Sequence, residues 1–394
     1  MFRTIPDPVL LFIPVFTSSS RLMLIATHPD DESLACGVVL QRAVLAGAAI
    51  RVVYATDGEN NPWPQRVIEC KWRLGQTDRE RWGKLRRAEA VAALNVLGVN
   101  ASDVFFLALP DQKLTKLLLS GCERTLERLA AIITNWAPTD LLIPSISDTH
   151  PDHSALGVML RLVSKEGLSG EAPMSTWSYV VHGKSPAFFD RARSIGQTAT
   201  ETAVKLRTIR CHRTQLKLSE KRFLDHAARP ERLIKLSRWE AIGADGSISS
   251  ISRQIHSLSI NLQRSMKPTR PRAPALFVLG HDEAGALRCA RIRLPVRSSD
   301  VEMFDWVSGE RLEAARYRGD AFTGELMVPI DAFSPDHALF VKLERRGWFF
   351  DEAGWLELPP AMHSAAVVTE AFSAELLLLQ ARSLSPNEKN HWSP

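Results

Sequence analysis

From residue 21 to residue 181, short apolar runs alternate with longer stretches of helical periodicity. The expected strands cover residues 22–26, 50–55, 104–108, 141–144 and 175–181. The expected helices cover residues 33–48, 79–97, 122–136 and 151–164. Strands that alternate with helices in this way are typical of βαβ units around a parallel sheet. The pattern therefore predicts an α/β fold with a Rossmann-like, doubly wound, mostly parallel sheet.

Polar clusters follow four of the expected strands at the point where each strand ends. They are His28-Pro29-Asp30-Asp31-Glu32, Thr56-Asp57-Gly58-Glu59, Pro110-Asp111 and the stretch from Ser145 to His153. Open α/β sheets bind ligands in the crevice beyond the carboxyl ends of their strands. We therefore expect these four loops to meet at one site.

The first cluster carries more metal-binding and proton-handling groups than folding requires. His28 and Asp31 are three residues apart and can point to a common centre at the start of a helix, with Asp30 beside them. Of two neighbouring carboxylates, one can coordinate a metal while the other accepts a proton from a water whose pKa the metal lowers.

A second motif, His150-Pro151-Asp152-His153, follows the fourth expected strand. Proline suits the first position of a helix, so His150 and His153 flank its opening turn and can face the same crevice. Asp152 is expected to orient a histidine ring there and is counted with the catalytic residues. A catalytic zinc site typically has three His, Asp or Glu ligands and one open position. The expected ligand set is His28, Asp31 and His153.

Helix capping offers a purely structural interpretation, in which Asp30 or Asp31 is an N-cap residue and His150 is a hydrogen-bonded loop residue. Each residue taken alone fits capping well. Two such motifs at matching strand ends favour a functional site instead.

The paired motifs resemble those of the LmbE-like or PIG-L deacetylases, zinc-dependent enzymes that remove acetyl groups from N-acetylglucosamine in glycolipids, glycans and thiol cofactor precursors. The resemblance covers residues 22–215 and includes Lys205, His212 and Gln215 as weaker matches. It implies a zinc held by His28, Asp31 and His153. It also implies that zinc-bound water attacks the acetamide carbonyl, with Asp30 as general base and His150 as the acid or oxyanion stabiliser.

Four further residues are predicted to contact substrate. By resemblance, Arg86 holds sugar hydroxyls or a phosphate, whereas Asp57 and Asp111 are placed at the site by their positions at strand ends. Trp63, in the loop Asn60-Asn61-Pro62-Trp63-Pro64, is the best candidate for stacking on a sugar. Asp148 is a departure, because some members of the family carry a substrate-facing Tyr there.

The 394 residues are 45% hydrophobic, which is enough for a large core and two domains. We expect an N-terminal arm (1–20), a deacetylase domain (21–260), a linker (261–274), a β-rich accessory module (275–360) and a C-terminal helix with a tail (361–394). Ser334-Pro335-Asp336-His337 mimics the second motif without its first histidine and is interpreted as a β-turn.

The five scattered cysteines form no Cys-x-x-Cys pair, which favours a reducing, intracellular setting over a disulfide framework. No apolar run approaches the roughly 20 residues that a membrane span needs, and the apolar N-terminal stretch is interpreted as a packing arm rather than a signal peptide. A cytoplasmic location is expected. The net charge of +5 adds peripheral association with an anionic inner membrane face as a further expectation.

The sequence thus predicts a hydrolase that deacetylates an N-acetylated amino sugar in a glycolipid, a cell-envelope glycan such as lipopolysaccharide, or a precursor. No nucleic-acid partner is expected. Alternatives are a non-catalytic glycan-binding protein with a residual metal site, a deacetylase of a small thiol glycoside precursor, and Fe²⁺ in place of Zn²⁺. A nucleotide-binding Rossmann protein is disfavoured, because the loop after the first strand lacks Gly-x-Gly-x-x-Gly and carries carboxylates where a phosphate would bind.

Overall fold

The computed structural model describes residues 13–166, 174–183, 185–237, 245–263, 274–320, 322–344, 346–347 and 349–361. Its central seven-stranded sheet has the order β3-β2-β1-β4-β5-β7-β6. The strands are β1 (Arg21–Ala26), β2 (Ala49–Thr56), β3 (Val104–Leu109), β4 (Asp140–Pro144), β5 (Ser175–Tyr179), β6 (Arg193–Ile195) and β7 (Glu231–Lys235). β1 to β5 are parallel, whereas β7 runs antiparallel to both β5 and β6. The α/β class is confirmed, with a mixed sheet.

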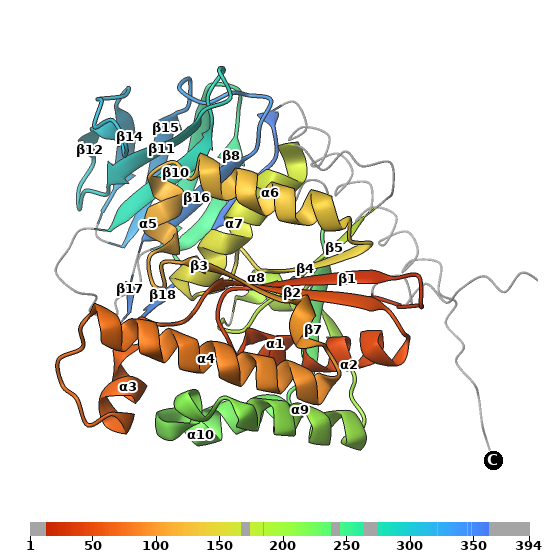
Figure 1. Cartoon of the computed structure of the whole chain (residues 1–394). Coiled ribbons are helices and arrows are strands. Elements are labelled where there is room, and N and C mark those ends of the chain that lie inside the picture. Colours follow the sequence, from red (N-terminus) through yellow and green to blue (C-terminus); the bar gives the residue numbers. More distant parts are fainter. Residues whose placement is uncertain are drawn as a thin grey trace, which may run out of the picture.

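Helices cover both faces of this sheet (Figure 1). They are α1 (Asp31–Ala35), α2 (Gly37–Leu45), α3 (Pro62–Ile68), α4 (Gln76–Leu97), the 3₁₀ helix η2 (Ala101–Asp103), α5 (Leu114–Leu119), α6 (Glu123–Trp136), α7 (Pro151–Glu166), α8 (Pro186–Phe189), α9 (Ala199–Cys211) and α10 (Arg213–Ala228). Side chains of β1 alternate between two hydrophobic cores, with Met23 and Ile25 in one and Leu22 and Leu24 in the other. A strand buried on both faces needs such a continuous apolar run.

The single helix expected over residues 33–48 is wrong, because the structure breaks it at Cys36 into α1 and α2. The cause is a carboxylate from a distant strand. The backbone N–H groups of Val38 and Val39 donate to Glu231 at 2.8 and 3.0 Å, and Lys205 holds the same carboxylate at 2.8 Å. A buried acidic group at a helix N-terminus satisfies N–H groups that have no partner within the helix.

The C-terminal part forms two antiparallel five-stranded sheets, ordered β13-β11-β10-β16-β19 and β12-β14-β15-β9-β8. Their strands, with those of a small two-stranded ribbon, are β8 (Ile248–Arg253), β9 (Ser257–Gln263), β10 (Ala275–His281), β11 (Leu287–Arg293), β12 (Ser299–Val301), β13 (Met303–Asp305), β14 (Ala315–Gly319), β15 (Thr323–Pro329), β16 (Leu339–Glu344), β17 (Arg346–Gly347), β18 (Phe350–Asp351) and β19 (Leu356–Leu358). Both sheets contribute to one core, as the alternating Leu258, Ile260 and Leu262 of β9 illustrate.

The β-rich part, here called the β module, therefore begins with β8, earlier than the predicted residue 275, because β9 pairs with β15. Most of the predicted linker (264–273) and of the N-terminal arm (1–12), and nearly all of the predicted C-terminal helix (362–380), lie outside the described residues. Among the helices that the structure describes, none is long and apolar enough to cross a membrane.

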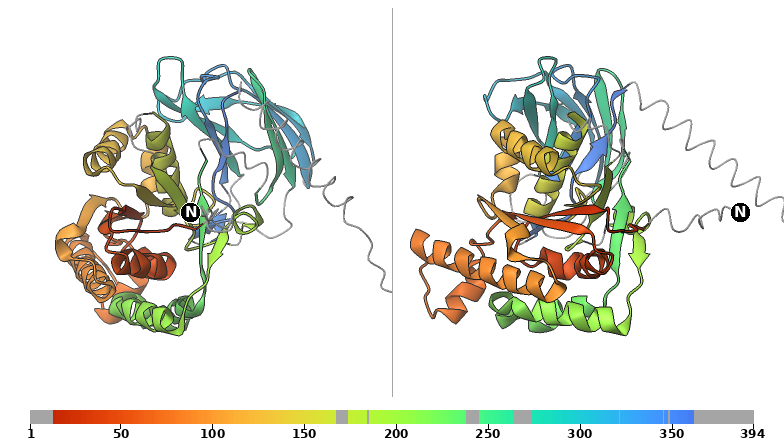
Figure 2. Two further views of the ribbon diagram at one scale, coloured as in Figure 1. Left: turned by 90° about the vertical axis from the view of Figure 1, so that its right-hand side faces the viewer. Right: turned by 45° about the vertical axis from the view of Figure 1, so that its right-hand side comes forward.

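The β module packs directly on the α/β part, alongside α7 (Figure 2). Arg161 of α7 makes two hydrogen bonds, of 2.8 and 2.9 Å, to the fully buried Glu357 of β19. The β module also holds the loop after β4 through two backbone hydrogen bonds. Asp351 N–H donates to Thr149 O at 2.8 Å, and Trp355 N–H donates to Ile146 O at 2.7 Å. Hydrophobic residues of α7 and β10 belong to one continuous core.

Gly354 marks the closest approach of the β module to that loop. A Cβ atom at this position would lie 2.0 Å from Ile146 O and 2.6 Å from Ser147 Cα, so the backbones must separate to admit one. We expect Gly354→Ala to lower the free energy of unfolding by about 1–3 kcal/mol, as overpacking does elsewhere, measured by urea denaturation. Gly196→Ala is the matched control, because its Cβ would meet no atom within 4 Å. Equal stability of the two variants would contradict this close packing.

Candidate metal centre and active site

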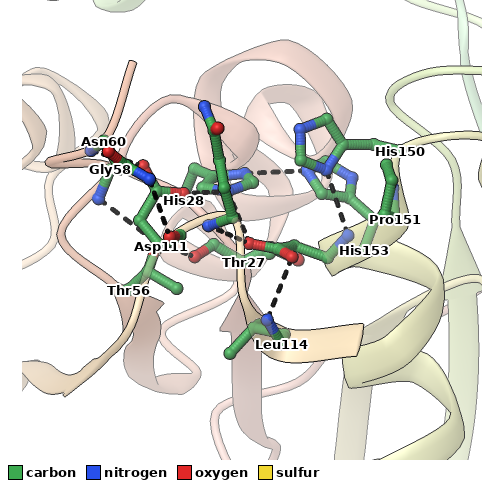
Figure 3. A network of polar contacts seen from close by, with 12 residues as sticks. Thr27, His28, Thr56, Gly58, Asn60, Asp111, Leu114, His150, Pro151 and His153 are labelled. Atoms are coloured by element: carbon green, nitrogen blue, oxygen red, sulfur yellow. Dashed lines mark hydrogen bonds and ion pairs between the residues drawn. The ribbon is translucent and has the colours of Figure 1, made fainter. Parts of the chain in front are cut away.

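The two histidine motifs meet because β1 and β4 are neighbours in the sheet and both end at the same edge. His28 Nδ1 lies 2.9 Å from His153 Nε2, and both rings are buried (Figure 3). Two nitrogens that each bind one zinc ion at about 2.0–2.1 Å must lie roughly 3 Å apart. The separation in this structure therefore fits a shared divalent metal ion.

Asp31 can supply a third ligand. Its Oδ2 accepts hydrogen bonds from the backbone N–H groups of Thr27 (2.9 Å) and His28 (3.0 Å). Its Oδ1 lies 3.5 Å from His153 Nε2. Fixing one oxygen with backbone donors leaves the other directed at the histidine pair.

Two other groupings of three metal-binding side chains occur among the described residues. One is His28, His150 and His153, and the other is His28, Asp111 and Asp152; within each, the ligand atoms lie within 4.8 Å of one another. The site is thus rich in potential ligands around His28.

Each of the two central histidines has its remaining nitrogen held by a buried carboxylate. His28 Nε2 lies 3.1 Å from Asp111 Oδ1, and His153 Nδ1 lies 3.2 Å from Asp148 Oδ2. Such partners fix the ring orientation and make the ligating nitrogen more basic. Burial lowers the pKa of His28, but its hydrogen bond to Asp111 and the nearby carboxylate of Asp152 outweigh this and hold the pKa well above its ordinary value.

From the sequence, Asp148 was named only as a departure from the family and was assigned no role at the site. It is fully buried and accepts hydrogen bonds from the backbone N–H groups of His150, Val181 and His182 at 2.8–3.0 Å. Burial raises the pKa of its carboxyl, yet the neighbouring His153 and the hydrogen bonds bring the pKa below its ordinary value. Its place two residues before His150 was the available signal. The predicted substrate contact Asp111 also holds a histidine.

Asp30 lies at the cavity in an unusual backbone conformation. Its φ of 147° is one that residues other than glycine rarely adopt, a strain that persists where surrounding contacts impose it. Its N–H donates to Glu32 (3.0 Å), which forms a buried ion pair with His212 (2.7 Å). Burial raises the pKa of Asp30 to about 6 although Arg86 opposes this rise. A carboxylate held in this way can accept a proton.

Arg86 faces the cavity, but its guanidinium is engaged by the protein. It donates to Asp30 Oδ2 (2.9 Å), Pro29 O (2.7 Å) and Gly58 O (2.9 Å). These contacts assign it a role in holding Asp30. Its predicted contact with substrate stays a prediction.

His150 is oriented by its own helix. Its Nδ1 accepts a hydrogen bond from the backbone N–H of Asp152 at 3.2 Å. Because an N–H can only donate, the proton of the neutral ring is on Nε2. Burial and the nearby His153 and His28 hold the pKa of His150 well below its ordinary value. A neutral imidazole with Nε2–H available can donate to a developing oxyanion.

Asp152 holds a neighbouring loop in addition to lying near a histidine, and its predicted role in orienting that ring stays a prediction. Its carboxylate accepts hydrogen bonds from the backbone N–H groups of Gln112 (2.6 Å) and Leu114 (3.1 Å). It reaches His28 Nε2 only at 3.9 Å. Asp152 therefore fixes the loop that carries Asp111, which in turn contacts His28.

These groups open into a cavity of about 260 Å³, called here the inner cavity. His28, Asp30, Asp111 and His150 line it, together with the half-exposed Trp63. The late segments add further lining residues, which are His182, Gln215, Arg222, Phe349 and Phe350. Asp57 lies apart from this lining and pairs with Arg87 at 2.7 Å.

The site thus defines a class: an α/β protein with a candidate metal centre at the strand ends, made of two buried histidines with carboxylate partners. Residues 23–163 match the family model described as PIG-L: GlcNAc-PI de-N-acetylase. This match confirms, over that segment, the PIG-L (LmbE-like) resemblance seen in the motifs.

Among curated proteins, the chain is similar to the 1D-myo-inositol 2-acetamido-2-deoxy-alpha-D-glucopyranoside deacetylase of Mycobacterium avium (strain 104). The two are 28% identical over 171 residues, 40% of this chain and 56% of the relative. The protein of the same name from Mycobacterium tuberculosis (strain CDC 1551 / Oshkosh) is 31% identical over 150 residues, 35% of this chain and 48% of the relative. The chain therefore spans about half the length of these relatives.

Among solved structures, the N,N'-diacetylchitobiose deacetylase from Pyrococcus horikoshii aligns over 54% of this chain and 82% of its own. The two share 18% sequence identity, with a TM-score of 0.42.

Asp148 tests the support of the centre. Both carboxylate oxygens of Asp148 accept hydrogen bonds from backbone N–H groups. In Asp148→Asn, either orientation of the amide would place an NH₂ group against one of these N–H donors. We expect the affinity for added zinc to fall about 10–100-fold, as it does when outer partners of metal ligands are removed, measured by competition with a chromogenic chelator. Asp331→Asn, at an exposed carboxylate, is the matched control and should bind normally. Unchanged affinity in a folded Asp148→Asn protein would show that Asp148 does not support the centre.

Proposed function

We propose that this protein is a metal-dependent hydrolase that removes the acetyl group from an N-acetylated amino sugar of the N-acetylglucosamine type. The observation that carries the proposal is the buried pair of His28 Nδ1 and His153 Nε2, 2.9 Å apart, next to the cavity that His28 and Asp30 line. The family match and the named activity of the mycobacterial relatives support the same reaction class. The parallel order of β3-β2-β1-β4-β5 supports a Rossmann-like, doubly wound sheet with the site beyond its strand ends.

Zinc is the metal proposed for the centre, with His28, Asp31 and His153 as ligands. Asp31 is preferred to His150 as the third ligand because its Oδ1 is directed at His153, whereas His150 Nδ1 is engaged by a backbone N–H. Bound zinc would polarise the acetamide carbonyl and lower the pKa of a coordinated water. Ferrous iron suits the same residues but is not needed for hydrolysis.

The protein's own groups supply the proton chemistry. Asp30, steadied by Arg86, takes a proton from the attacking water, whose oxygen forms a bond to the acetyl carbon. His150 donates its Nε2–H toward the carbonyl oxygen as negative charge develops there. When the C–N bond breaks, the amine nitrogen receives the proton that Asp30 took from the water, whereas the neutral ring of His150 donates only a hydrogen bond. The products are acetate and a free amino sugar.

The acceptor is proposed to be a glycolipid, a cell-envelope glycan or a precursor of one, with a small thiol glycoside as the alternative. The half-exposed ring of Trp63 at the inner cavity supports stacking on a sugar face. We further propose a cytoplasmic location with peripheral attachment to the membrane, which the net positive charge supports.

Asp30→Asn tests the proposed base. Because an amide cannot accept the proton, we expect kcat/KM for acetate release from an N-acetyl sugar to fall about 10²–10⁴-fold, while bound zinc, measured by elemental analysis, is retained. Asp300→Asn, at an exposed carboxylate in the β module, is the matched control and should keep full activity. Full activity of Asp30→Asn would rule out this base.

Removing the metal tests the centre itself. We expect a protein stripped with a strong chelator to lose acetate release, and stoichiometric zinc to restore it. Ferrous iron added under anaerobic conditions would compare the alternative metal. A rate that survives verified metal removal would contradict a metal-dependent mechanism. A protein that binds zinc and N-acetyl sugars but releases no acetate from any of them would instead be a non-catalytic glycan-binding protein.

A further inference from the structure

A second cavity lies next to the inner cavity, where the β module faces the first turns of α5 and α7. Its volume is about 570 Å³, more than twice the 260 Å³ of the inner cavity. We call it the outer groove. Small-molecule ligands typically occupy sites of roughly 300–1,000 Å³. The inner cavity is therefore small for anything beyond a single sugar, whereas the outer groove has room for more.

The two cavities share part of their walls. Gln112, His150 and Phe349 line both of them. A ligand whose acetamide group reaches His150 from the inner cavity can therefore continue past Phe349 into the outer groove. Phe349 belongs to the β module and is about 38% exposed.

Trp306 forms an aromatic surface in the outer groove. It follows β13 and is 37% exposed. Its ring packs edge-to-face on Phe277 (centroids 5.5 Å apart, 82° between planes), and the Arg291 guanidinium lies 5.1 Å from its centroid. Its backbone N–H donates to Cys289 O at 2.7 Å. A large apolar ring that is held from behind and half open to a groove is suited to pack against the C–H face of a sugar.

Two lysines, Lys113 and Lys116, also line the groove, at the start of α5. Both are exposed, and among the described residues neither has a carboxylate partner. Two carboxylates also line the groove, but Asp152 is engaged by backbone N–H groups, and Glu344 lies on the β16 side. Two ammonium groups without a carboxylate partner, in the same groove as an exposed aromatic ring, favour a sugar that carries negative charge.

We propose that the outer groove binds further sugar units of the same substrate, so that the protein acts on an extended, acidic glycan chain rather than on a free amino sugar. The reacting N-acetyl sugar occupies the inner cavity. The next units lie against Trp306, with their carboxylate, sulfate or phosphate groups toward Lys113 and Lys116. The inference rests on the proposed deacetylase function and assigns the β module a part in substrate binding.

The test compares three substrates with the intact protein: N-acetylglucosamine, a neutral chitin tetrasaccharide, and a hyaluronan tetrasaccharide, in which N-acetylglucosamine alternates with glucuronate. For wild-type protein we expect KM to fall about tenfold from the monosaccharide to the acidic tetrasaccharide. Trp306→Ala should raise KM for both tetrasaccharides about three- to tenfold, leaving kcat and the monosaccharide KM unchanged. Trp306→Phe should recover most of the loss. Phe322→Ala, an exposed aromatic outside the groove lining, is the matched control.

Lys113→Gln combined with Lys116→Gln tests the charge. It should abolish the preference for the acidic over the neutral tetrasaccharide, and so should raised salt with wild-type protein. An equal effect of Trp306→Ala on mono- and tetrasaccharide, or a wild-type KM independent of chain length, would overturn the inference while the deacetylase function stands.

Calorimetric binding of the hyaluronan tetrasaccharide separates the two proposals further. Weaker binding by Trp306→Ala supports the groove even if no acetate is released, in which case the proposed function alone fails. Equal binding by wild type and Trp306→Ala counts against the groove.

Discussion

Two imidazole nitrogens 2.9 Å apart in a buried site cannot both carry a proton, because their N–H groups would then point at one another. The contact between His28 and His153 therefore keeps at least one lone pair directed into the centre. The second nitrogen of each ring lies at hydrogen-bond distance from a carboxylate, that of His28 from Asp111 and that of His153 from Asp148. These carboxylates favour a proton on the outer nitrogen of each ring. This arrangement prepares the pair for a cation, and much of the surrounding structure serves to hold it.

Asp148 links this centre to the rest of the fold. Its carboxylate gathers backbone N–H groups from the second motif and from the segment after β5, which fixes the loop between β4 and α7. The β module covers the outer side of the same loop through Asp351 and Trp355. Buried and fully hydrogen-bonded networks of this kind are rigid. The β module consequently supports the metal centre as well as lining the cavity.

The sequence predicted the parts of this site that depend on local pattern and strand order. The meeting of His28, Asp30 and His153 could be predicted because apolar runs indicated two strands and each motif directly follows the end of one of them. The roles of Asp111 and Asp148 could not be predicted, because they depend on which ring nitrogen a loop carboxylate reaches. The break at Cys36 depends on Glu231, almost 200 residues away in the chain. The pairing of β9 with β15 is likewise long-range, and its side-chain alternation does not name the partner strand.

The residues that line the inner cavity fall into two sets, one inside and one outside the segment that the family model matches. The matched segment, residues 23–163, contains every residue proposed for metal binding and proton transfer. Much of the wall around them comes from later in the chain, with His182 after β5, Arg222 on α10, and Phe349 and Phe350 from the β module. Under the proposed function, the first set carries out the chemistry at the acetamide and the second contacts the group attached to it. If the protein is a deacetylase, the choice of substrate therefore depends on these later walls as well as on the segment that the family model matches.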